Sequence, residues 1–230
     1  MNLGDLCTLY RREMSDTARP YFWKDEEVRE YAADSYRMFV RLTGGIADFT
    51  SDATLVDVVA GEAIAELDDS ILRIMGASLV SSGEPVQIIN LTDLQTAAKD
   101  DYGIVRRLMN DKTPGAVRYM VIGRQRHVAQ LVQVPEANDQ LQLDIYRMPL
   151  DTIATDGSND DFEFDEVGKE HHRHLVMWMR ALGYNKHDAD TFDPIKAGTF
   201  DAKFREYCAQ VTAEWERYKH KNRVVSYGGL

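Results

Sequence analysis

Hydrophobic residues recur every three or four positions at the start of the chain, a spacing that predicts an amphipathic helix beginning after Asn2. Its apolar face is made of Leu3, Leu6, Leu9 or Tyr10, and Met14. Segment 14–20 breaks this helix and ends in a proline. A second helix is predicted from an N-cap at Asp25, with an acidic first turn at 26–27, to a stop near the glycines at 44–45. Its apolar face contains Val28, Tyr31, Ala32, Ser35 and Phe39.

Three consecutive aromatic residues, Tyr21, Phe22 and Trp23, lie between these two helices. They admit two interpretations. Exposed aromatic side chains dominate many protein interfaces, so the three could form a recognition surface. The simpler interpretation is a hydrophobic staple or core contact that fixes the angle at which the chain enters the second helix.

Between residues 50 and 150 the pattern changes to runs rich in β-branched residues, which predict strands. These runs are Thr54–Val59, Ile71–Val80, Pro85–Ile89, Val117–Ile122, His127–Val134 and Leu141–Tyr146. The last run alternates strictly, as in an antiparallel sheet with one wet face, and we expect Pro135–Gln140 to join it to the preceding run as a hairpin. Further turns are predicted at 81–85 and 123–126. A helical segment capped by Thr92 or Asp93 interrupts the strands at 91–109, and Gly103 divides it.

Helical spacing returns near the C-terminus. Val167, His171, Leu175, Trp178 and Leu182 predict one helix ending near Gly183. After a cap at Thr199, the final helix carries a long apolar stripe made of Phe200, Phe204, Tyr207, Cys208, Val211, Trp215 and Tyr218. We expect this stripe to be buried against the first two helices, because fully covering one such side chain is worth about 1.5–3 kcal/mol.

These elements predict an α+β fold. An antiparallel helical bundle is formed from both chain ends, residues 1–50 and 151–222. Residues 51–150 form a β-rich antiparallel insertion, and 223–230 form an extended C-terminal tail. The two cysteines, Cys7 and Cys208, lie in apolar helical stripes, which favours reduced buried thiols over a disulfide or a metal site.

The net charge of −11 argues against a protein that coats nucleic acid, since phosphate binding depends on clustered Lys and Arg. The charges are unevenly distributed. Segment 151–170 has eight acidic residues and one Lys, whereas 217–230 has two Lys, two Arg and no acid. These stretches are either solvated faces or complementary patches that pair subunits or steer a partner. No apolar run is long enough to span a bilayer and no leader is evident, so we expect synthesis in the cytoplasm and no membrane contact.

Two chemical alternatives remain open. A metal-dependent hydrolase would use the cluster of Glu170, His171 and His174, with His172 nearby, although Arg173 stands where a Glu-x-x-His motif needs its histidine. A DNA-packaging subunit would hold phosphate with the basic residues at the end of the last helix, which are Arg217, Lys219, Lys221 and Arg223. The same cations also complement the negative end of a helix dipole. We expect no enzyme activity and no cofactor.

Several blocks resemble head-to-tail adaptor, or connector, proteins of tailed bacteriophages, especially those with short tails. The blocks are the first helix, Pro20–Val28, Ile71–Ile74, Ser82–Pro85, Glu170–Val176, Asp188–Thr191, the final helix and Arg223–Gly229. Lys24 departs from the Ser or Thr that usually caps the second helix in that family.

The resemblance implies a structural virion protein at the head–tail junction. Copies would form a ring, commonly dodecameric, beneath the portal and would support a downstream nozzle or hub protein. Genome ejection would send DNA through the central channel without sequence-specific binding. The resemblance also implies that the tail residues Arg223, Val224, Val225, Tyr227, Gly228 and Gly229 bind the portal. The alternative interpretation of this segment is an ordinary frayed terminus. Possible further interface residues are Tyr21, Phe22, Trp23, Arg217, Lys219 and Lys221.

Overall fold

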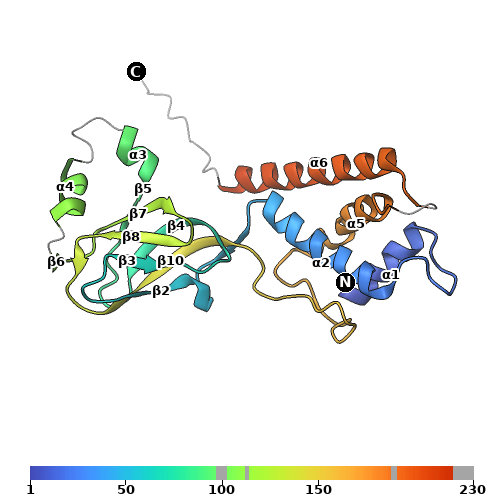
Figure 1. The fold of residues 1–230 in the computed structure, drawn as a ribbon, viewed down its shortest axis with the longest axis horizontal. Coiled ribbons are helices and arrows are strands. Elements are labelled where there is room, and N and C mark those ends of the chain that lie inside the picture. The colour runs from blue at the N-terminus through green and yellow to red at the C-terminus, as the bar shows by residue number, and fades with distance from the viewer. Residues whose placement is uncertain (97–102, 112–113, 188–190, 220–230) are drawn as a thin grey trace, which may run out of the picture. The chain divides into compact units, whose positions relative to one another are not determined.

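The computed structural model describes residues 1–96, 103–111, 114–187 and 191–219 (Figure 1). The chain divides into two compact units. Unit 1 joins Met1–Gly44 with Pro149–Leu230, and unit 2 is the continuous segment Gly45–Met148. The fold is mixed α+β, with the long helices in unit 1 and the sheets in unit 2.

Unit 1 begins with α1 (Leu3–Glu13) and α2 (Asp25–Leu42). The predicted start of α1 is confirmed. The Asn2 side chain accepts a hydrogen bond from the Asp5 amide at 2.8 Å, and the Asp5 carboxylate accepts one in return from the Asn2 amide, which together form a capping box. The predicted N-cap of α2 is wrong by one position, because Lys24 occupies the cap without a side-chain bond. Asp25 is instead the first helical residue, where its charge still favours the positive end of the dipole.

The C-terminal helices of unit 1 are a short 3₁₀ turn, η2 (His172–His174), followed by α5 (Leu175–Tyr184) and α6 (Pro194–Lys219). The helix predicted to include Val167 and His171 therefore begins later. α6 begins earlier than predicted, and Thr199 lies inside it, where its hydroxyl donates to the Ile195 carbonyl at 2.8 Å.

Helix α5 packs against α6 and α2, and it also contacts α1 (Figure 1). Polar contacts accompany this packing: Trp178 Nε1 donates to Asp34 at 2.7 Å, and Arg180 donates to Glu13 at 2.6 Å. The largest fully buried side chains of unit 1 include Tyr10, Tyr36, Phe164, Leu175, Met179 and Phe204. α6 thus packs chiefly on α5, which contributes more to covering its stripe than the first two helices do.

The predicted burial of the α6 stripe is correct in the middle of the helix and wrong at its end. Phe204, Cys208 and Val211 are buried. Trp215 is 52% exposed and Tyr218 is 88% exposed, so the last turns of α6 extend beyond the helices that cover the rest of the stripe.

Unit 2 contains two four-stranded sheets. In the first, the long strand β10 (Asp139–Arg147) is central and pairs antiparallel with β1 (Ile46–Asp48), β2 (Leu55–Val58) and β4 (Ile71–Leu79). The second has the order β3 (Ile64–Glu66), β8 (Val128–Val132), β7 (Tyr119–Gln125), β5 (Gln87–Asn90). The turn η1 (Asp52–Thr54) precedes β2. A small pair joins β6 (Pro114–Gly115) to β9 (Val134–Pro135).

Three features of unit 2 differ from prediction. The unit is not wholly antiparallel, because β5 pairs with β7, and β6 with β9, in parallel. The expected hairpin through Pro135–Gln140 is wrong, since β8 and β10 belong to different sheets. The β7–β8 turn falls at 126–127, and Gly123, with φ +89°, lies within an irregular part of β7.

Two apolar clusters stabilise unit 2. One combines side chains from both sheets, including Val56, Ile74, Leu141 and Leu143 from the first and Ala65, Met120 and Leu131 from the second. The other lies where α3 (Leu91–Thr96) and α4 (Gly103–Asp111) cover the second sheet, and it includes Ile89, Leu94, Val105, Val121 and Val132. Residues 97–102, between the two helices, lie outside the described chain. Among the described residues, no helix has the length and apolarity required to cross a membrane.

Candidate interaction surfaces

The aromatic connection between α1 and α2 is organised by a buried ion pair. Arg11 Nη1 donates to Asp16 at 2.5 Å, and Arg11 Nη2 donates to Asp25 at 2.6 Å and to the Trp23 carbonyl at 3.0 Å. Asp16 in turn accepts the Phe22 amide at 2.7 Å. Because the charges and backbone polar groups satisfy one another, the connection has a fixed conformation despite lying between helices.

The three aromatic residues of this connection have different environments. Trp23 is only 3% exposed and meets Tyr10 edge to face, with ring centroids 5.7 Å apart. Tyr21 is partly buried beneath the Arg11 guanidinium, which lies 3.9 Å from its ring centroid. Phe22 is 40% exposed. Trp23 therefore occupies the core position expected of a staple, and Phe22 is the ring most available to a partner.

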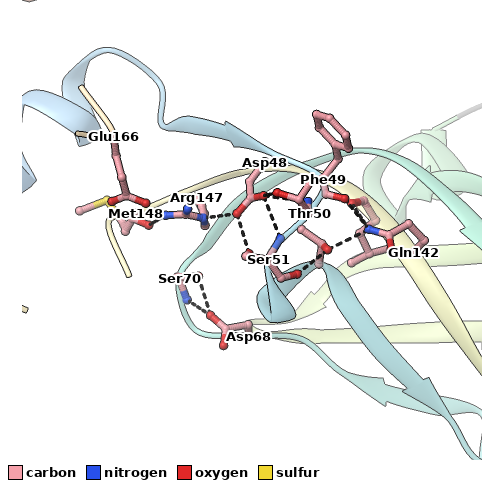
Figure 2. Close-up of polar contacts among 12 residues, drawn as sticks. Asp48, Phe49, Thr50, Ser51, Asp68, Ser70, Gln142, Arg147, Met148 and Glu166 are labelled. Carbon is pink, nitrogen blue, oxygen red and sulfur yellow. Dashed lines mark hydrogen bonds and ion pairs between the residues drawn. The ribbon is translucent and has the colours of Figure 1, made fainter. Parts of the chain in front are cut away.

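A second organised surface lies at the start of unit 2, where Asp48 holds the turn after β1 (Figure 2). Asp48 Oδ1 accepts the amides of Thr50 at 2.9 Å and Ser51 at 3.2 Å. Asp48 Oδ2 accepts the Ser51 hydroxyl at 2.6 Å and also the Nε–H of Arg147, on the neighbouring strand β10. Burial by itself would raise the pKa of Asp48, but these hydrogen bonds outweigh it and hold the pKa well below its ordinary value.

This turn presents Phe49 to solvent. The Phe49 carbonyl accepts a hydrogen bond from Gln142 Nε2 at 2.9 Å, and the same amide nitrogen donates to Thr54 Oγ1 at 2.8 Å. Figure 2 shows the Phe49 ring directed away from this polar network, and the residue is 67% exposed. An exposed aromatic ring on a rigid turn suits a contact surface, because little conformational entropy is lost on binding.

The sequence does not predict the Asp48 surface. Its only local signal is an Asp followed within three residues by Thr and Ser, a pattern typical of turns in which the carboxylate caps nearby amides. The essential partner, Arg147, is 99 residues away in the chain. No local pattern indicates that pairing.

The histidines of the predicted metal cluster are engaged with an aromatic side chain. His171 Nδ1 lies 2.9 Å from Tyr207 Oη, and the His174 ring stacks on the Tyr207 ring at a centroid distance of 3.8 Å. His172 is buried, and its Nε2 lies 2.9 Å from the Val167 carbonyl, so that nitrogen carries the proton. Within the described parts of the chain, no three His, Cys, Asp or Glu residues are arranged to hold a metal ion. His171 and His174 thus help to pack η2 and the start of α5 against α6.

The predicted basic surface and tail are only partly within the described chain. Arg217 is exposed on the last turns of α6. The placement of the Lys219 side chain, and of Lys221 and the predicted portal-binding residues Arg223, Val224, Val225, Tyr227, Gly228 and Gly229, lies outside the described residues. Their roles stay predictions.

Comparison with known proteins identifies the family. A search of curated proteins gave no match. The family model described as SU10 adaptor protein matches residues 1–225, nearly the whole chain and both of its units. The chain therefore belongs to the SU10 adaptor protein family and is a phage adaptor protein, a component of the virion.

Proposed function

We propose that this protein forms a ring between the portal and the tail of the phage, with a central channel through which the genome passes. The observation that carries the proposal is the family match, which extends through both units. An adaptor must offer separate surfaces to the protein above it, the protein below it and its neighbours in the ring. Two compact units provide such separate surfaces on one chain.

In this proposal unit 1 is a helical bundle built from both chain ends and repeats around the ring axis. The packing of α5 against α1, α2 and α6 supports a rigid body suited to side-by-side repetition. Unit 2 is the inserted β-rich domain. Residues 223–230 bind the portal, and the opposite side of the ring receives a nozzle or hub protein. DNA passes during ejection without sequence-specific contacts, which is consistent with the net charge of −11.

The resemblance to adaptors of short-tailed phages favours a dodecamer at the head–tail junction. The hydrolase alternative gains no support from the described histidines, since His171 and His174 both contact Tyr207. The packaging alternative depends on a few cations at the end of α6 that lie beside acidic Glu214 and Glu216. Neither alternative has an observation in its favour comparable to the family match.

Electron microscopy of the purified protein with the portal of the same phage tests the proposal. We expect the protein alone to be monomeric or weakly associated, and to form rings on the portal. Size measurements with and without the portal provide the second readout. A stable compact dimer under both conditions would contradict the ring.

A further inference from the structure

Residues 102–135, which include α4, β7 and β8, carry an excess of positive charge that is unusual in this acidic chain. Residues 102–135 contain six Lys and Arg and one acid, Asp111, although the whole protein has a net charge of −11. Arg107 on α4, Arg118 before β7, Arg124 at the end of β7 and Arg126 in the following turn are exposed. Among the described residues, none of these four forms an ion pair.

Arg124 lies on the wall of a groove of about 650 Å³ between α4 and the strands β3, β7 and β8. Its guanidinium donates to Gln130 Oε1 at 2.7 Å, a neutral partner that leaves the charge uncompensated. The apolar part of the lining comes from Ile64, which is 60% exposed, together with Leu108, Met109, Val128 and Val134. An apolar groove with an arginine in its wall has the composition of a protein-binding surface, in which arginine is enriched.

The same chain carries the complementary surface in unit 1. Of the acidic residues in 151–170, Asp160 is paired with Arg29 at 2.7 Å. Asp151, Asp161, Glu163 and Asp165 are exposed and form no ion pair with any described residue. Leu150, which directly precedes Asp151, is 44% exposed. This segment therefore offers an apolar side chain followed by free carboxylates.

We propose that the Arg124 groove of one copy binds the acidic segment 150–165 of a second copy. Leu150 enters the apolar part of the groove, and Asp151 with its acidic neighbours meets Arg124 and Arg126. Because the two surfaces differ, the contact is head-to-tail. Repeated head-to-tail contacts form a closed ring when the rotation from one copy to the next brings the last copy back to the first. This inference rests on the proposed ring and names its lateral contact.

A nucleic acid is the competing partner for a cluster of arginines. The lining of the groove favours the protein segment. It consists largely of apolar and glutamine side chains, which suit an apolar residue such as Leu150 and offer little to a phosphate backbone.

Isotope-resolved cross-linking tests the contact directly. Arg124→Lys keeps the positive charge and supplies an amine, which a carbodiimide joins only to a carboxylate in direct contact. Equal amounts of unlabelled and ¹⁵N-labelled full-length variant are mixed at low salt, cross-linked without the portal and analysed by mass spectrometry. We expect mixed-isotope peptides that join position 124 to segment 151–165, with a yield at least about threefold lower at 500 mM than at 50 mM salt.

Arg205→Lys is the matched control. Arg205 is also exposed, but it pairs with Asp201 of its own helix at 2.9 Å. Its cross-link to Asp201 should therefore join peptides of one isotope only. Cross-links from position 124 that are confined to one isotope, that reach other carboxylates, or that fail to form while the control succeeds would overturn the inference.

Charge reversal separates this inference from the proposed function. Arg124→Glu with Arg126→Glu should prevent ring formation on the portal, and adding Glu163→Lys with Asp165→Lys in the same chain should restore it. Rings that form equally well with all variants would refute the groove contact and leave the adaptor function standing. Mixed-isotope links without any portal rings would support the contact and refute the function. Duplex DNA binding that Arg124→Gln abolishes, without mixed-isotope links, would assign the groove to nucleic acid instead.

Discussion

Replacing Asp48 by Asn tests how the turn after β1 is held. The Asp48 side chain is 5% exposed and that of Arg147 is 8% exposed, so the ion pair is shielded from water. Asn keeps the oxygen that accepts the Thr50 and Ser51 amides but places an NH₂ group where Oδ2 stood. Ser51 can rotate its hydroxyl to accept from that group. Arg147 has only donors and is left facing another donor.

The expected cost follows from this geometry. Breaking a buried ion pair by removing one partner costs about 3–5 kcal/mol. Asp48→Asn keeps both hydrogen bonds from the Thr50 and Ser51 amides. We therefore expect a cost at the lower end of this range, so the free energy of unfolding of unit 2 should fall by about 3 kcal/mol. The matched control is Asp57→Asn on β2, where an exposed carboxylate accepts Gln140 Nε2 at 2.9 Å; this change should cost under about 0.5 kcal/mol.

The sign of the pH dependence is fixed by the lowered pKa of Asp48. An unfolded aspartate titrates near 3.9, and the folded carboxyl titrates lower. The stabilisation from the charged form is therefore complete above about pH 5 and is lost as the pH falls through the unfolded pKa towards the folded one. Asp48→Asn lacks this contribution at every pH. The difference in stability between wild type and variant should shrink as the pH decreases from 6 to 3.

Urea unfolding can assign the effect to the correct unit. All three tryptophans, Trp23, Trp178 and Trp215, lie in unit 1, so their fluorescence reports on that unit. Far-UV circular dichroism of the β signal reports on unit 2. We expect the dichroism transition of Asp48→Asn to move to lower urea while the fluorescence midpoint moves much less. Equal shifts in Asp48→Asn and Asp57→Asn, or a pH-independent difference, would refute this account of the turn.

Further predictions concern unit 1. Trp23→Ala should cost about 3–5 kcal/mol in chemical unfolding, whereas Phe22→Ala should cost under about 1 kcal/mol, because only the tryptophan is buried. Burial raises the pKa of the Cys208 thiol to about 11, so a thiol reagent at pH 8 should modify it only after unfolding. Burial, followed by the nearby His171 and Arg173, lowers the pKa of His174. The unfolded chain therefore binds a proton at this histidine more readily than the folded one, and the folded state should lose stability as the pH falls below about 6.5. His174→Phe should remove the part of this pH-dependent loss that comes from His174. Deleting 223–230 should leave the melting temperature unchanged and weaken portal attachment in a pull-down.

Local signals in the sequence predicted the elements that are determined locally. The start of α1 followed from Asn2 and the apolar spacing behind it, because a capping box involves only residues three apart. The strands at Ile71–Leu79 and Asp139–Arg147 followed from β-branched and alternating runs. The choice of strand partner did not follow. β10 skips the neighbouring β8 and pairs with β1, β2 and β4, and that choice depends on which faces the whole unit can bury.

The candidate surfaces show the same division. Glu170, His171 and His174 are close in sequence and suggested a metal site. Tyr207 of α6 instead forms a hydrogen bond with His171 and stacks on the ring of His174. Asp48 and Arg147 are far apart in sequence and suggested nothing, yet β1 and β10 place them side by side. Closeness in sequence suggested a metal site at the histidines that the packing does not form, and distance in sequence gave no indication of the Asp48–Arg147 pair. Tertiary packing decides which polar groups meet.

The apolar stripe of α6 shows that periodicity indicates which face of a helix is apolar but not how much of that face is buried. Apolar residues repeat at helical spacing from Phe204 to Tyr218 without a break. The sequence therefore does not indicate that burial of the stripe ends after Val211. α6 has 26 residues and α5, its main partner, has 10, so at 1.5 Å per residue the longer helix extends well past the shorter one. Trp215 and Tyr218 are exposed because of this difference in helix length. An amphipathic pattern therefore indicates which side of a helix is apolar, and only the lengths of its neighbours indicate how far that side is buried.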